Sequence, residues 1–134
     1  MCVFGWGPSS NVFDVMDLLQ VLGLSPVVNF AYMPLHWRSD TSFGEVFLNA
    51  VTPEAALELW GILDGMQFEG ESECLTVRWA TKVQGLDALI QKYRNSSAMH
   101  PSVPVKAKPH LFDDGRCSRF PDPTRKLAKP RRHA

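Results

Sequence analysis

The sequence has little of what disulfide-bonded, secreted and membrane-spanning proteins need. Its three cysteines, Cys2, Cys74 and Cys117, are odd in number and far apart, which argues against a disulfide framework and against metal-ligand spacing. It has no run of 18 apolar residues, and its first ten residues lack the basic flank and long apolar stretch of a signal peptide. We therefore predict an intracellular location, nuclear or cytoplasmic, and no membrane contact.

The sequence also lacks a recognisable catalytic pattern. The Gly5-x-Gly7 pair has neither the third glycine nor the Lys-Ser/Thr that a phosphate-binding loop needs. The histidines lie in loop or tail contexts without paired carboxylates or a cysteine at catalytic spacing: His36, His100, His110 and His133. We expect no enzyme, no cofactor, no metal site and no small-molecule substrate.

The formal net charge of zero hides an uneven distribution. Residues 1–100 carry five basic and eleven acidic residues, a net charge of −6, whereas residues 101–134 carry nine basic and three acidic residues, a net charge of +6. The second segment also holds six prolines. This composition predicts an acidic folded part of about residues 1–97 and a Pro-rich, basic, largely disordered tail at 98–134.

One stretch, Thr41–Val51, alternates with the period of a β-strand. Successive side chains of a strand point to opposite faces, so Val46, Leu48 and Ala50 are predicted to be buried. The opposite face then displays a large aromatic residue, Phe47, between Glu45 and Asn49. An aromatic side chain on the polar side of a strand is either incidental or a contact.

The other predicted elements follow from apolar periodicity and from capping residues. Asn11 with Asp14 resembles a capping box, and Thr52 before Pro53 marks a second helix start. The predicted elements are strands at 2–6, 27–33 and 74–80, and helices at 12–22, 53–64 and about 85–95. The first strand is predicted to bury Phe4 and display Val3. The order β-α-β-β-α-β-α predicts an α+β ferredoxin-like sandwich, with four antiparallel strands in the order 4-1-3-2, two helices on one face and an extra C-terminal helix.

A resemblance to the Mei-two-like family spans about residues 2–121. Lys108-Pro-His-Leu-Phe112 and Arg119-Phe-Pro121 are similar to the segment that follows the C-terminal RNA recognition motif of that family, and five sequence blocks resemble the motif itself. They are Phe30-Ala-Tyr-Met-Pro34 with Leu35-His-Trp37, Gly44-x-Val-Phe-Leu-Asn49, Thr52-Pro-Glu-Ala-Ala56, Val83-Gln-Gly-Leu-Asp-Ala-Leu-Ile90 and Tyr93-Arg-Asn-Ser-Ser97. In that family the motif usually ends a longer chain, so the resemblance implies that this chain is part of one. Two stretches depart from the family pattern. The first strand and turn read Gly5-Trp-Gly-Pro-Ser-Ser-Asn11 in place of the usual basic motif, and Glu45 stands where an aromatic is usual.

The resemblance implies binding of single-stranded RNA by the sheet face, with the basic tail as a further contact, in post-transcriptional regulation. The implied RNA-binding residues are Val3, Trp6, Tyr32, Arg38, Phe47, Asn49, Arg78 and Lys82. An alternative stays open: the last helix covers the sheet, Phe47 packs beneath Leu89, Ile90 or Tyr93, and the degenerate motif serves protein–protein contact. The basic tail is either solvated or functional, since its charge offsets an acidic domain that repels RNA.

Overall fold

The structure is a computed structural model that describes residues 1–36, 39–71, 73–79 and 85–130. The helices that capping residues and apolar periodicity predict in the sequence are present in it. Helix α1 spans Val12–Val21; the Asn11 side chain accepts hydrogen bonds from the backbone of Phe13 and Asp14, and the Asp14 side chain accepts one from the backbone of Asn11. Helix α2 spans Pro53–Leu63, and the Thr52 hydroxyl caps it. Helix α3 spans Leu86–Arg94. The three predicted helices are confirmed.

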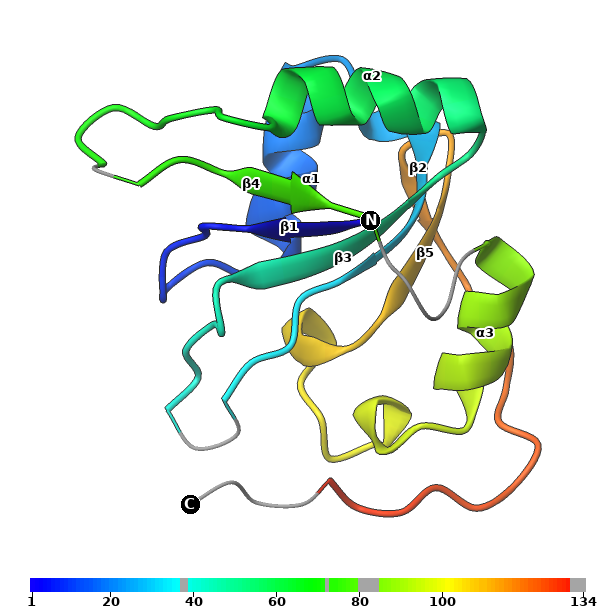
Figure 1. Cartoon of the computed structure of the whole chain (residues 1–134). Helices are drawn as coiled ribbons and strands as arrows, with labels where there is room; N and C mark the ends of the chain where they lie inside the picture. The colour runs from blue at the N-terminus through cyan, green and yellow to red at the C-terminus, as the bar shows by residue number, and fades with distance from the viewer. Residues whose placement is uncertain (37–38, 72, 80–84, 131–134) are drawn as a thin grey trace.

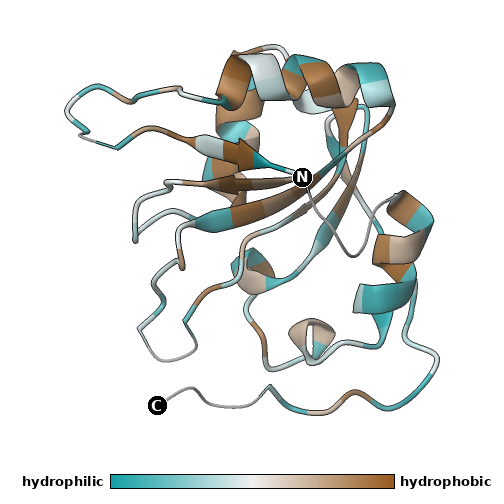
Figure 2. Cartoon of the chain, in the orientation of Figure 1, coloured by the Kyte–Doolittle hydropathy of each residue, from teal (hydrophilic) through white to brown (hydrophobic). Residues whose placement is uncertain are grey.

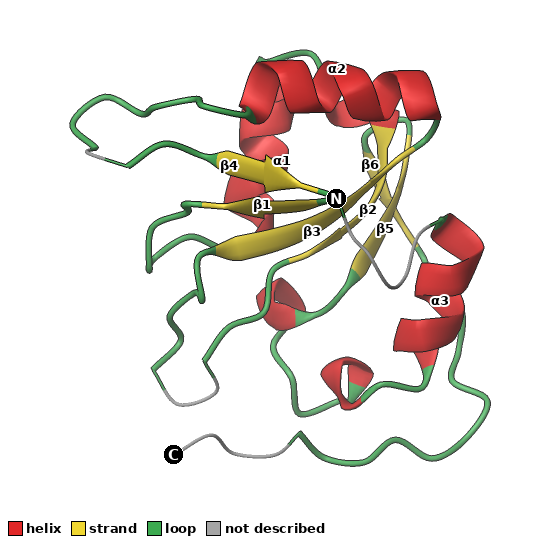
Figure 3. Cartoon of the chain, viewed as in Figure 1, coloured by secondary structure: helices red, strands yellow, loops and turns green. Residues whose placement is uncertain are grey.

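The sheet has six antiparallel strands, and the prediction of four is wrong. The strands are β1 (Cys2–Phe4), β2 (Val28–Tyr32), β3 (Glu45–Ala50), β4 (Thr76–Arg78), β5 (His110–Asp113) and β6 (Arg116–Ser118). Their spatial order is β4-β1-β3-β2-β5-β6, so the predicted order 4-1-3-2 is present inside a longer sheet (Figure 3). Short 3-10 helices occupy Ser25–Val27, Ser97–Met99 and Val105–Ala107.

The two extra strands come from the segment predicted to be a disordered tail. That prediction is wrong for residues 98–118, because β5 pairs with β2 and β6 pairs with β5, beyond the predicted domain boundary at residue 97. Prolines and basic residues dominate the composition there, but Leu111 and Phe112 are each about 8% exposed and pack on opposite faces of the sheet. Leu111 and Phe112 therefore provide apolar contacts on both faces of the sheet where β5 pairs with the apolar strand β2.

The main core lies between the sheet and helices α1 and α2. Val46 and Leu48 of β3 pack there with Val15 and Leu19 of α1 and Leu59 of α2. Apolar residues run along the central strands in Figure 2, and Figure 1 shows α1 and α2 together on one side of the sheet and α3 apart from them. The predicted burial of Val46 and Leu48 on β3 is confirmed.

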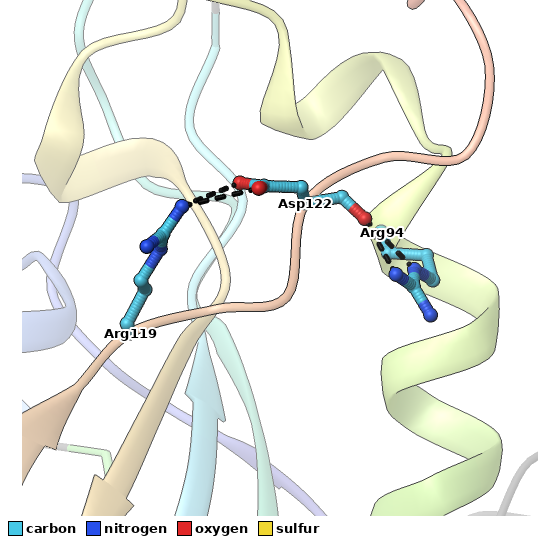
Figure 4. Close-up of polar contacts among 3 residues, drawn as sticks. All are labelled: Arg94, Arg119 and Asp122. Carbon is cyan, nitrogen blue, oxygen red and sulfur yellow. Dashed lines mark hydrogen bonds and ion pairs between the residues drawn. The ribbon is translucent and has the colours of Figure 1, made fainter.

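A second, smaller core holds α3 against the other face. Phe30 on β2 and Leu111 on β5 pack with Leu89 and Tyr93 of α3. The segment after β6 returns to the C-terminal end of this helix, where the Arg94 guanidinium donates two hydrogen bonds, of 3.0 and 2.7 Å, to the backbone carbonyl of Asp122. The Asp122 carboxylate accepts two more from Arg119 (Figure 4). Residues 119–124 thus form a strap that fastens α3.

Candidate functional site

The face of the sheet opposite α1 and α2, here called the open face, carries the residues singled out on β3. Glu45, Phe47 and Asn49 are half-buried, whereas Val46 and Leu48 between them are buried in the main core. Phe47 lies opposite Cys2 on β1 and opposite Tyr32 on β2, and Glu45 lies opposite Phe4. The open face therefore has one row of Arg78, Cys2, Phe47 and Tyr32, and a neighbouring row of Thr76, Phe4 and Glu45.

The parity predicted for the first strand is wrong. Val3 lies opposite Val46 and is fully buried in the main core, so it is not displayed on the open face. Phe4, predicted to be core, is half-buried and lines the open face instead. A strand of three residues has too few positions to define an alternation, and a shift by one residue exchanges the two faces.

Helix α3 covers only one end of the open face. Phe30 of β2 is fully buried beneath it, and Tyr32 meets the Tyr93 ring edge-on at 5.2 Å between centroids. Phe47 stacks beside Tyr32, with centroids 6.2 Å apart, and packs at the margin of the second core. Phe47 is therefore neither fully open nor fully covered by α3.

A groove of about 880 Å³ extends from the part of the open face that α3 leaves free to the start of α2. Its floor includes Phe4, Glu45, Phe47 and Asn49 from β1 and β3, and α3 forms one wall. Two basic side chains line it from opposite sides, Arg78 on β4 and Lys92 on α3, and both residues are exposed. Aromatic side chains flanked by basic ones can stack with bases and neutralise phosphates, a combination found in proteins that bind single-stranded nucleic acids.

The charge of Glu45 influences the other ionisable groups of the open face. Burial first, and the nearby Glu45 carboxylate second, raise the pKa of the Cys2 thiol to about 11. Burial likewise raises the pKa of Tyr32 to about 12, with Tyr93 and Glu45 as additional causes. The pKa of Tyr93 is raised by burial first and then by Cys2 and Glu45. The side chains of Cys2, Tyr32 and Tyr93 stay protonated at neutral pH. Glu45 is therefore the acidic side chain of this part of the open face.

The remaining predicted site residues divide into three groups. Asn49 and Arg78 line the groove, and the Asn49 amide donates a 2.8 Å hydrogen bond to the side-chain oxygen of Asn29. Trp6 does not reach the open face: it is buried in the main core, where its ring lies 5.9 Å from that of Phe68. Arg38 and Lys82 lie outside the described residues.

Sequence reasoning did not place Phe4 in the groove, and it named Lys92 only as a possible phosphate contact and Leu86 only as part of an apolar helix face. Phe4 was assigned to the core because the parity of its strand was reversed, although its aromatic ring was a signal. Lys92 and Leu86 belong to α3, and the apolar periodicity of this helix does not show where on the sheet the helix packs. The apolar stripe of that helix showed that it covers a surface, and only the fold shows which one.

Metal binding and membrane insertion have no structural support in the described part of the chain. Across residues 1–36, 39–71, 73–79 and 85–130, no group of three or more His, Cys, Asp or Glu side chains is arranged to hold a metal ion. Within those same ranges, no helix combines the length and the apolar composition that crossing a membrane requires.

Comparison with curated proteins gives a consistent set of relatives. Protein MEI2-like 5 of Arabidopsis thaliana is 29% identical over 86 residues, which are 63% of this chain and 10% of the relative. Protein MEI2-like 3 of the same plant is 29% identical over 98 residues, 72% of this chain and 12% of the relative. Protein MEI2-like 4 of Oryza sativa subsp. japonica is 27% identical over 85 residues, 63% of this chain and 8% of the relative. The chain spans about a tenth of the length of these relatives, and no family model matches it.

Proposed function

The chain resembles the RNA recognition motif of the MEI2-like proteins, and on that premise we propose that it binds single-stranded RNA in the groove of the open face. The observation that carries the proposal is the groove itself: it is lined by two phenylalanines, Phe4 and Phe47, and by two basic residues, Arg78 and Lys92. In RNA recognition motifs, aromatic residues of the two central strands stack with unpaired bases.

Each part of the groove has a role in this proposal. Phe47 is the principal stacking residue, and Phe4 on the adjacent strand offers a second ring. Arg78 and Lys92 neutralise phosphates along the groove walls, and Asn49 offers a polar contact at the end of β3. Tyr32 supports the Phe47 ring from the side, with its own ring partly covered by α3. We also propose that the predicted residues Arg38 and Lys82 contribute phosphate contacts, as does the basic segment that begins at Arg125.

The alternative, a sheet covered by α3 and used for protein contact, is less well supported. A fully covered face would leave no room for a base, whereas the groove beside α3 has a volume of about 880 Å³. Helix α3 instead shields the most apolar end of the open face, Phe30 and Leu111, from water. In this proposal α3 is a wall of the RNA site.

The test measures the affinity of the whole chain for a fluorescently labelled pool of short single-stranded RNAs. Replacing Phe47 by Ala is expected to weaken binding about five- to 150-fold, since stacking contributes roughly 1–3 kcal/mol per base. The matched control is Phe13→Ala, because Phe13 is a phenylalanine of α1, 39% exposed and outside the groove. Equal affinities for the wild type and the Phe47 variant, or no binding by the wild type, would contradict the proposal.

A further inference from the structure

The groove contains a carboxylate where an RNA-binding surface is expected to be aromatic or basic. Glu45 is the first residue of β3; it lies two residues before Phe47 on the same face and directly opposite Phe4. Its side chain is therefore next to both rings on which a base would stack. A base above either ring would present an edge to this carboxylate.

Among the residues that the structure describes, Glu45 makes few contacts that could balance its charge. Its Oε2 lies 3.9 Å from the Sγ of Cys2, a long contact with a weak donor. Within the described parts of the chain, Glu45 takes part in no ion pair. Arg78 and Lys92 line the same groove without an ion pair to it among those residues, so the half-buried carboxylate keeps its capacity to accept hydrogen bonds.

The arrangement of charges separates phosphate from base. The basic groups are exposed and come from the edge strand β4 and from α3, whereas Glu45 is half-buried on the central strand β3. A phosphate at the position of Glu45 is repelled, and a base edge with N–H donors is attracted there.

The four bases differ in what they offer to a carboxylate. An ionised carboxylate only accepts hydrogen bonds, and its two oxygens match two parallel donors. Guanine presents two adjacent donors, N1–H and its 2-amino group. In adenine and cytosine the amino group stands beside a ring nitrogen that is itself an acceptor, and in uracil the single N3–H lies between two carbonyl oxygens. Only guanine meets both carboxylate oxygens with donors and places no acceptor against either of them.

We infer that Glu45 selects guanine for the base position next to Phe47 and Phe4, so that the groove prefers single-stranded RNA with a guanine at that position. The inference rests on the proposed RNA-binding function and specifies its ligand. In it, Phe47 supplies affinity that is independent of base identity, and Glu45 supplies the discrimination. Removing the carboxylate is therefore expected to change the ratio between the affinity for guanine-containing RNA and the affinities for the other RNAs. The average affinity for all the RNAs is expected to change less.

The experiment uses the whole chain and short uridine-rich RNAs with one central nucleotide varied among guanosine, adenosine, cytidine, uridine and inosine. The wild type is expected to bind the guanosine RNA about tenfold or more tightly than the adenosine, cytidine or uridine RNAs, as for a bidentate base contact. Inosine, which keeps N1–H but lacks the 2-amino group, is expected to fall between. Glu45→Gln is expected to reduce the guanosine preference to about twofold or less, because its amide has one acceptor in place of two.

Two further variants separate the possible results. Glu58→Gln, at an exposed position of α2 outside the groove, is the matched control and is expected to keep the preference. If the wild type shows no guanosine preference, or Glu45→Gln keeps it, while Phe47→Ala still weakens binding to every RNA, the inference is overturned and the proposed function stands. If the wild type binds none of the RNAs, both are overturned.

Discussion

The rings of Phe30 and Tyr93 stack with their centroids 5.5 Å apart and their planes at 29°. Phe30 belongs to β2 and is fully buried, and Tyr93 belongs to α3 and is 8% exposed. This pair joins α3 to the sheet and fixes one wall of the groove. The strap of residues 119–124 strengthens the attachment, because Asn95 and Thr124 also exchange hydrogen bonds of 2.8 and 2.9 Å.

Replacing Tyr93 by Ala is expected to lower the free energy of unfolding by about 2–4 kcal/mol, since it removes a buried aromatic ring and leaves a cavity above Phe30. Tyr93→Phe is the matched control, because the Tyr93 hydroxyl has no hydrogen bond among those found in the described residues, and we expect it to change stability by less than about 1 kcal/mol. Urea unfolding followed by circular dichroism measures both. A Tyr93→Ala variant with the wild-type midpoint would show that α3 is not held by this stack.

Ending the chain at residue 97 is expected to abolish cooperative unfolding. The shortened chain loses β5 and β6, exposes Phe30, and leaves β2 as an unpaired edge strand that favours aggregation. A chain that ends at residue 124 keeps both strands and the strap, and we expect it to melt cooperatively, close to the full chain. Thermal melting of the three chains checks this. A fragment 1–97 that melts like the full chain would show that β5 is not part of the stable sheet.

The stability of the protein is expected to fall as the pH rises from about 10 toward about 12. The pKa of Tyr32 is about 12 in the folded protein and that of Tyr93 is also raised, whereas a phenol in an unfolded chain ionises near ~10. The unfolded state therefore releases these protons first, so the stabilisation present below the unfolded pKa is lost as pH rises through the folded one.

The chain has two tyrosines, which makes this alkaline titration easy to assign. Phenolate absorbance followed against pH in the native protein is expected to show both groups ionising later than in urea. Tyr32→Phe is expected to remove the step at the highest pH. Two tyrosines that ionise near ~10 in the folded protein would contradict the burial of these rings beside α3.

The salt dependence of RNA affinity reports how many basic groups take part. If Arg78 and Lys92 alone neutralise phosphates, the logarithm of the association constant is expected to fall with the logarithm of salt concentration with a slope of about −1.4, from about 0.7 per contact on single strands. Arg78→Gln is expected to reduce this slope by about half. A slope of about −3 or steeper would indicate that further basic groups also contact the RNA, among them Arg38, Lys82 and the basic segment beginning at Arg125.

The predictable part of the fold depends on interactions between residues that are close together in the sequence. Asn11 and Asp14, Thr52 and Pro53, and the alternation from Glu45 to Asn49 each specify a local structure, and each is present. On β3 the alternation placed Phe47 on the open face. On β1, three residues were too few to define an alternation, and Val3 and Phe4 were assigned to each other's faces.

The groove depends on contacts between segments distant in the sequence. Phe30 meets Tyr93, and β2 pairs with β5, although 63 and about 80 residues respectively separate the partners in the sequence. Neither contact leaves a periodic signal in its own segment, and the Pro-rich, basic composition around Leu111 and Phe112 concealed a strand pair.

The sequence alone determined the three helices, the side-chain caps of α1 and α2, and the order of the four central strands. It also determined the displayed position of Phe47 and Glu45 and the resemblance to MEI2-like proteins that the comparisons confirm. Only the tertiary structure decided that Phe4 rather than Val3 shares the groove, that two more strands extend the sheet, and that α3 covers Phe30 while leaving Phe47 at the margin. The physical reason is range: caps and alternation act over a few neighbouring residues, whereas the groove forms where packing brings distant residues together.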